Sequence, residues 1–233
     1  MNVTLVDRLL RFPREVAGEC RDDGDLAPIA AHAITVIVLG AMLFGAAVGA
    51  WRGQAQIAYA ALKLPLVTIA TLAVCVPAFH AIAAVFGRPW SLRSAVAIML
   101  VAGARFSLVL LAAAPVVWLT VSLGASYDAV KLIAAFAYAL GGLAALGLVL
   151  GGLGPGPGRL ATVLTFVSVF LVVGGQSAWI LRPYLGTPGR DDITFFTRER
   201  EGGLAYQLWV SVGHVVGAAA PRVPPAGTTE TAR

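Results

Sequence analysis

Five long hydrophobic runs dominate the middle of the chain, and short turns rich in glycine or polar residues separate them. The runs lie at 26–50, 64–86, 106–123, 132–153 and 160–181. An α-helix needs roughly 20 apolar residues to cross the ~30 Å hydrocarbon core of a bilayer, and each run is close to that length. The pattern predicts an all-α fold, a polytopic transmembrane helical bundle of about five spans with interfacial helices.

The composition supports a protein that is solvated by lipid. Hydrophobic residues make up 58% of the chain and charged residues only 12%, about half the ~25% share of a soluble domain. The net charge is +5, which in a soluble protein would suggest a nucleic-acid partner. Here the basic residues cluster at the ends of the hydrophobic runs, where lipid headgroups lie. We therefore expect membrane lipid as a partner, and no nucleic acid.

Tails flank the predicted bundle. We assign 1–25 to an amino-terminal amphipathic and acidic tail, 26–182 to the transmembrane bundle and 183–233 to a carboxy-terminal tail. The first dozen residues have hydrophobic positions near helical spacing, which predicts a short interfacial helix or a frayed tail. In the last tail, about 203–218 is expected to lie on the membrane surface as a helix rather than to form a sixth span, and 221–233 to be disordered.

The stretch at 91–104 is the least certain part of the predicted topology. It is too apolar for an aqueous loop and too short to cross a membrane alone, so we expect an interfacial or re-entrant helix that leads to Arg105 at the start of the third span. One long tilted helix over 91–123 is an alternative, and a hairpin with Arg105 at its outer turn is another. The five-span arrangement places seven basic residues on each side, so the positive-inside rule does not decide the orientation.

Small residues spaced four positions apart occur in the first and fourth runs. Gly45 and Gly49 form the first pair, and Gly141 and Ala145 form the second. Helices approach closely where side chains are absent. We predict that these positions pack against neighbouring helices.

No motif of a soluble enzyme is evident. The glycine-rich stretch at 151–158 lacks the Lys-Ser/Thr ending of a phosphate loop and contains prolines, so it predicts a turn. Lys63 lies near a predicted span end, where its side chain would reach toward the headgroups. His80 is expected to be a neutral core histidine bonded to a carbonyl freed by Pro77, with a proton relay as the alternative. Catalytic activity, a metal site and a cofactor are not expected.

The segment from 174 to 206 concentrates unusual residues. Gln176 places an amide inside a span, Trp179 suits the interfacial belt, and Arg182 ends the span. The charged run that follows consists of Arg198, Glu199, Arg200 and Glu201. That run predicts a solvated turn or an intramolecular contact with Arg105, Asp128 or the acidic amino-terminal tail. Together with Arg105, these residues are the candidates for function or assembly.

Several short motifs carry a resemblance to a known family. They are Lys63-Leu64-Pro65, Ser91-Leu92-Arg93, Ala114-Pro115 and the pattern from Gln176 to Tyr206. The chain resembles small bacterial polytopic proteins related to the Yip1-type five-span fold. The resemblance implies a five-span bundle without an assigned activity; eukaryotic relatives are vesicle-trafficking proteins that engage small GTPases. The long charged carboxy-terminal tail departs from the eukaryotic pattern.

These observations predict a non-enzymatic multi-pass integral protein of a bacterial cytoplasmic membrane. We expect it to act as a scaffold or accessory subunit of a membrane assembly, with a protein partner or as a homo-oligomer. A small transporter or channel is the alternative, because prolines interrupt the predicted helices. Against the alternative, no Asp or Glu lies in the middle of a predicted span and no internal repeat is detectable.

Overall fold

The computed structural model describes residues 3–21, 26–53, 55–87, 90–154, 156 and 158–180. These residues form seven helices and no strand. The helices are α1 (Val3–Arg11), α2 (Pro13–Arg21), α3 (Ala27–Gly49), α4 (Ala55–Val85), α5 (Leu92–Ser122), α6 (Tyr127–Leu153) and α7 (Arg159–Ile180). The prediction of an all-α helical bundle is confirmed.

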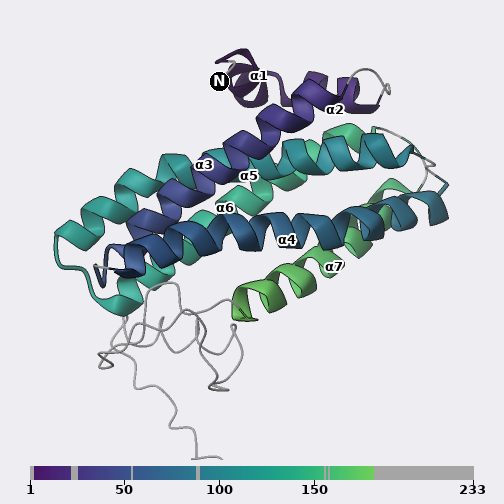
Figure 1. Ribbon diagram of the computed structural model, residues 1–233. Helices are drawn as coiled ribbons and strands as arrows, with labels where there is room; N and C mark the ends of the chain where they lie inside the picture. The colour runs from purple at the N-terminus through teal and green to yellow at the C-terminus, as the bar shows by residue number, and fades with distance from the viewer. Residues whose placement is uncertain are drawn as a thin grey trace, which may run out of the picture.

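The long helices α3 to α7 run across Figure 1 in alternating directions and are joined by short turns at the two ends. Helix α3 packs against α4 and α5, α5 also packs against α6, and α7 packs against α4. Helices α1 and α2 lie above the long helices in Figure 1 and contact α5 and α6. Helices α3, α5 and α7 begin at one end of the bundle, which we call the amino-terminal end. Helices α4 and α6 begin at the other end, which we call the opposite end.

Local sequence explains where the long helices start and stop. The Ser91 hydroxyl accepts a hydrogen bond from the backbone N–H of Ser94 at 3.1 Å, and Ser126 does the same for Ala129 at 3.3 Å. Such side-chain caps satisfy N–H groups that have no partner in the first turn of a helix. Gly124, with φ 76°, follows α5, because a residue with a side chain rarely adopts this left-handed conformation.

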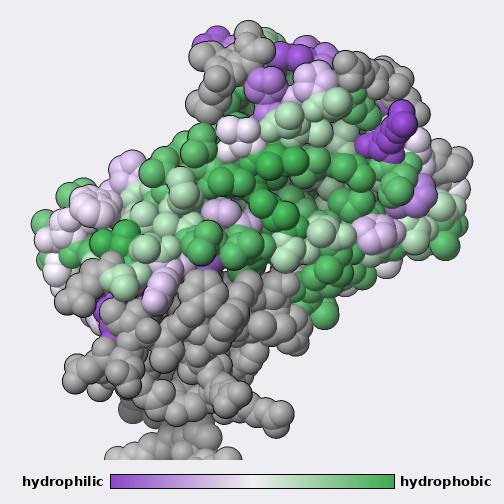
Figure 2. Space-filling view, in the orientation of Figure 1, coloured by the Kyte–Doolittle hydropathy of each residue, from purple (hydrophilic) through white to green (hydrophobic). Residues whose placement is uncertain are grey.

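Four of the helices, α3 to α6, are long and apolar enough to cross a membrane. Helix α7 has 22 residues, but its side chains are described only as far as Gly174, and that apolar part is shorter than a span. Figure 2 shows hydrophobic residues over the middle of the bundle, while hydrophilic residues gather over α1 and α2. The protein is a multi-pass membrane protein, and α7 as a fifth span stays a prediction.

The buried residues form two clusters. The first lies toward the amino-terminal end and includes Leu9, Val16, Ala17 and Cys20 of the short helices. The second lies toward the opposite end, where the ring of Tyr138 meets the rings of Phe44 and Phe106 edge-on. Helices α1 and α2 therefore belong to the packed body of the protein.

Two predicted boundaries are wrong. Helix α5 is continuous from Leu92 to Ser122, so 91–104 is neither a separate interfacial or re-entrant helix nor one arm of a hairpin, and the single long helix holds. Helix α4 begins at Ala55, nine residues before the predicted span, and it continues through Pro65 and Pro77. Both helices have 31 residues, and buried residues extend from Gln56 to Ala83 in α4 and from Ser94 to Val117 in α5.

Candidate functional site

Arg105 lies in the middle of α5 rather than at the start of a span. It follows Leu92 by thirteen residues and precedes Ser122 by seventeen, which places it ~20 Å from one end of the helix and ~26 Å from the other. The side chain is half-buried. Within the described part of the chain, Arg105 makes no hydrogen bond and no ion pair.

No carboxylate from α3 to α7 can reach Arg105. The sole acidic residue between 27 and 180 is Asp128, in the first turn of α6. Phe106, the next residue after Arg105, lies against Gly141, where a Cβ would be 2.8 Å from the phenylalanine ring. Asp128 precedes Gly141 by thirteen residues, or ~20 Å along the helix, which is well beyond the reach of an arginine side chain.

Lys63 is fully buried, and it lies in the interior of α4 rather than near a span end. It shares one face of α4 with Gln56 and Thr71, seven and eight positions away, because that spacing corresponds to two helical turns. Both of these polar side chains are buried as well. The expectation that Lys63 extends to the headgroups is wrong, because neighbouring elements cover its side chain.

Two buried hydroxyls have no hydrogen-bond partner within the described part of the chain, Thr71 Oγ1 on α4 and Ser107 Oγ on α5. The carbonyl oxygen of Ser107 would lie 2.6 Å from a Cβ at Gly40, which places Ser107 at the contact of α5 with α3. Serine and threonine in a helix usually bond to a carbonyl of the preceding turn, as Thr68 does to Leu64 at 2.9 Å. The two unpartnered hydroxyls are polar sites inside the bundle that the sequence did not single out.

The remaining titratable residues form no evident chemical centre. The Nδ1 atom of His80 is buried and has no hydrogen-bond partner among the described residues, so this nitrogen does not make the expected bond to a carbonyl freed by Pro77. Cys20 and Cys75 are both free thiols. Among the described residues, no three His, Cys, Asp or Glu side chains come close enough to hold a metal ion.

Two of the predicted packing glycines lie where α3 meets α4. A Cβ at Gly45 would be 2.4 Å from the carbonyl oxygen of Ala60, and one at Gly49 would be 2.6 Å from that of Gln56. Gly141 meets the Phe106 ring, and Ala145 is partly buried against the first cluster. The structure brings these four residues into helix contacts.

The carboxy-terminal motif falls largely outside the described residues. Gln176 and Trp179 lie on the backbone of α7, but their side chains are beyond the described part. The residues outside it altogether are Arg182, Arg198, Glu199, Arg200 and Glu201. A contact of this motif with Arg105 or Asp128 stays a prediction.

One ion pair joins the two short helices, and a second lies within α1. Arg8 donates a hydrogen bond to Glu19, and Arg11 pairs with Asp7 at 2.7 Å. The bond from Arg8 lowers the pKa of Glu19 below its ordinary value of 4.5. Burial, with a smaller effect from the charge of Glu19, raises the pKa of the Cys20 thiol to about 11. The outer surface of this hairpin is thus charged while its inner surface is apolar.

Basic residues are concentrated at the amino-terminal end of the bundle. The six described ones are Arg8, Arg11, Arg14, Arg21, Arg93 and Arg159. The described acidic residues at that end number three, Asp7, Glu15 and Glu19. At the opposite end the described charges are Arg52, Lys131 and Asp128. The two ends therefore differ in basic charge within the described part of the chain.

Comparisons with protein-family models, with curated proteins and with solved structures gave no match. By its long apolar helices the chain is a multi-pass membrane protein, with an arginine in the middle of one of those helices.

Proposed function

We propose that the protein is a non-enzymatic scaffold or accessory subunit of a membrane assembly, and that its partner places an acidic side chain beside Arg105. The observation that carries this proposal is Arg105 itself, half-buried in the middle of α5 and without a hydrogen bond or ion pair in the described part. A charge at membrane depth is costly unless it is paired or faces water. A carboxylate from a partner helix offsets that cost, because it accepts two parallel hydrogen bonds from a guanidinium.

A different protein fits this role better than a second copy. Between 27 and 180 the chain has no acidic residue except Asp128, and that residue lies ~20 Å from the level of Arg105. The spans of a second copy thus offer no carboxylate at the required depth. Glu199 and Glu201 are the other candidates for this carboxylate, and they belong to this chain. The test must distinguish them from an acidic residue of a partner.

The test is co-purification in mild detergent of tagged wild type and variants at Arg105. We expect a stoichiometric partner with an Asp or Glu inside a transmembrane segment. Arg105→Leu should lose it and Arg105→Lys should retain it, because lysine keeps the charge. Arg93→Leu is the matched control, an exposed arginine on the same helix but at its end.

Two results would contradict the proposal. One is a partner that Arg105→Leu retains at the wild-type ratio. The other is a Glu199→Gln, Glu201→Gln double variant that loses the partner as Arg105→Leu does, since the carboxylate would then come from this chain.

A small transporter or channel is the second candidate, favoured by the polar groups inside the bundle. Lys63 is fully buried, and the hydroxyls of Thr71 and Ser107 have no hydrogen-bond partner among the described residues. Buried polar groups in membrane proteins often line a path for ions or substrates. Ion flux into liposomes containing the purified protein, abolished by Lys63→Met and retained by Arg105→Leu, would favour this candidate.

We also propose a bacterial cytoplasmic membrane as the location, with the amino-terminal end of the bundle in the cytoplasm. Cytoplasmic ends of spans carry an excess of Lys and Arg, and the described part has six basic residues at that end against two at the opposite end. Membership of the Yip1-type family remains a proposal that rests on the sequence motifs.

A further inference from the structure

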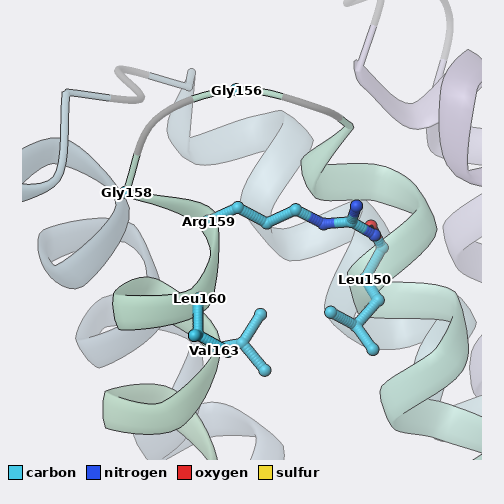
Figure 3. Close-up of a pocket in the computed structure, with 6 residues that line it drawn as sticks. All are labelled: Leu150, Gly156, Gly158, Arg159, Leu160 and Val163. Atoms are coloured by element: carbon cyan, nitrogen blue, oxygen red, sulfur yellow. Dashed lines mark hydrogen bonds between the residues drawn. The ribbon is translucent and has the colours of Figure 1, made fainter.

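A hollow lies beside the turn between α6 and α7, at the amino-terminal end of the bundle. Its volume is about 440 Å³, and its lining combines one cation with apolar side chains: Leu150, Gly156, Gly158, Arg159, Leu160 and Val163. Figure 3 shows Arg159 reaching from the start of α7 across to Leu150 of α6. Ligand pockets in proteins commonly have volumes of roughly 300–1,000 Å³, so the hollow has the size of a ligand site.

Arg159 has a hydrogen-bond donor left over inside this region. Its Nη2 atom donates to the carbonyl oxygen of Leu150 at 3.0 Å, which satisfies one of the last carbonyls of α6. Its Nε atom is buried, and within the described part it has no partner. A buried N–H of a charged group without an acceptor is uncommon and points to an unseen acceptor. An anionic oxygen suits a guanidinium best.

Two further arginines approach the same turn of α6 from α2. The Cγ atom of Arg14 lies 3.5 Å from the Cβ position of Gly151, and Nη1 of Arg21 lies 2.9 Å from that of Gly154. Together with Arg159 they place three positive charges around the last turn of α6. Two of the three described acidic residues of α1 and α2 are already paired, Glu19 with Arg8 and Asp7 with Arg11, and the third is Glu15.

The walls of the hollow show what kind of anion fits. The walls include the hydrocarbon side chains of Leu150, Leu160 and Val163. A free phosphate ion in the hollow would leave these side chains without contacts. Along α7, Leu160 and Leu164 are 71% and 58% exposed, so an apolar surface leads from the hollow toward the middle of the span. The site also lies at the ends of spans, where lipid headgroups are found.

We propose that this hollow binds the phosphate headgroup of one anionic phospholipid, with Arg159 as its direct ligand and Arg14 and Arg21 supplying the surrounding positive charge. The acyl chains would lie along the exposed leucines of α7. This site is independent of the partner proposed at Arg105, which lies on α5 at mid-membrane depth.

Native mass spectrometry of the delipidated full chain in detergent tests the proposal, with phosphatidylglycerol added back and phosphatidylcholine as the neutral comparison. One phosphatidylglycerol should bind more tightly than phosphatidylcholine. Arg159→Gln should weaken that binding at least about fivefold, the effect of one basic residue at a membrane surface. Arg93→Gln, an exposed arginine at the same end, is the matched control and should bind as wild type does.

Three results would overturn the proposal: equal binding of the two lipids, equal losses in the two variants, or displacement of the lipid by millimolar inorganic phosphate. The last would mean that the site takes a free anion. A second measurement uses only wild-type protein, so it does not depend on the folding of a variant. A phosphatidylglycerol with a photoreactive acyl chain should label peptides within 150–164, and labelling elsewhere alone would contradict the site.

Discussion

Helices α3 and α6 are both rich in small residues, but Gly45 and Gly49 of α3 bring two backbones into contact, whereas Gly142 and Gly147 of α6 do not. At Gly45 and Gly49 a Cβ would collide with the carbonyls of Ala60 and Gln56, at 2.4 and 2.6 Å. At Gly142 and Gly147 a Cβ would meet no atom within 4 Å. Helix α3 is therefore tightly held against α4, whereas α6 leaves part of its surface to lipid or to another protein.

Leucine at both positions of each pair would test this difference most strongly. Gly45→Leu with Gly49→Leu should lower the free energy of unfolding by about 3 kcal/mol or more, because a backbone carbonyl cannot move aside as a side chain can. Gly142→Leu with Gly147→Leu is the matched control and should change it little. Thermal melting in detergent measures both. Similar losses in the two double variants would show that the contrast between α3 and α6 is wrong.

The last turn of α6 differs from its middle, because α2 covers it. A Cβ at Gly152 would lie 3.3 Å from Ile98 and 3.7 Å from Ala17 of α2, and Cys20 of α2 is fully buried. In a Cys75→Ser background, labelling of Cys20 by a maleimide should be slow. A pKa of about 11 instead of 9.0 lowers the reactive thiolate fraction about a hundredfold.

Gly152→Leu should lift α2 from this turn and speed the labelling of Cys20, measured by mass spectrometry of the labelled peptide. Gly147→Leu, on the open part of the same helix, should leave the rate unchanged. If wild type already reacts as fast as an unfolded cysteine, α2 does not pack as described.

Much of the fold could be predicted from the sequence, because long hydrophobic runs leave few alternatives. The length of α5 could not, since Trp90, Ser91 and Arg93 are typical of an interface, and only contacts with α2, α3 and α6 show that the following residues are buried. The same limit applies to Lys63. Its burial depends on neighbours that are distant in the sequence, and hydropathy along the chain carries no such information.

The candidate site was also predicted only in part. Arg105 stands out in the sequence as a charge among apolar residues, but its depth depends on whether α5 is continuous. The unpartnered hydroxyls of Thr71 and Ser107 gave no signal, because serine and threonine are common in membrane helices. The hollow at Arg159 lies beside a turn. The sequence predicted that turn but gave no sign of the hollow.

Helix α5 also differs from place to place. It packs against α3, whereas Arg105 has no hydrogen bond or ion pair within the described part. Arg105→Leu should therefore raise the stability of the isolated protein by about 1–2 kcal/mol, a fraction of the ~2.5–3.5 kcal/mol that insertion scales assign to arginine in a helix centre. Melting in detergent without a partner measures it, with Arg93→Leu as the control. A clear loss of stability would mean that Arg105 is already paired within the chain.

The smallest effect is expected at the hairpin of α1 and α2. Glu19 has a lowered pKa because Arg8 donates a hydrogen bond to it, so it stabilises the fold above its ordinary pKa of 4.5. That contribution is lost as the pH falls through the lowered value. Glu19→Gln should cost at most about 1 kcal/mol at pH 7, since the pair is largely exposed. The melting temperatures of Glu19→Gln and wild type should become equal at acidic pH, where Glu19 is protonated. A difference that persists in acid would mean that the substitution acts through packing instead of charge.

A photocrosslinker on α5 tests most directly whether a partner covers Arg105. Ala112 is exposed and follows Arg105 by seven residues, so it lies on the same face of α5. A photoreactive residue at 112 should crosslink in cells to one protein, through a transmembrane segment that contains Asp or Glu, and Arg105→Leu should abolish the product. The same residue at Ala73, on the exposed face of α4, is the control and should give no such product. Crosslinks to lipid alone at 112, or a protein product that Arg105→Leu leaves intact, would contradict the account.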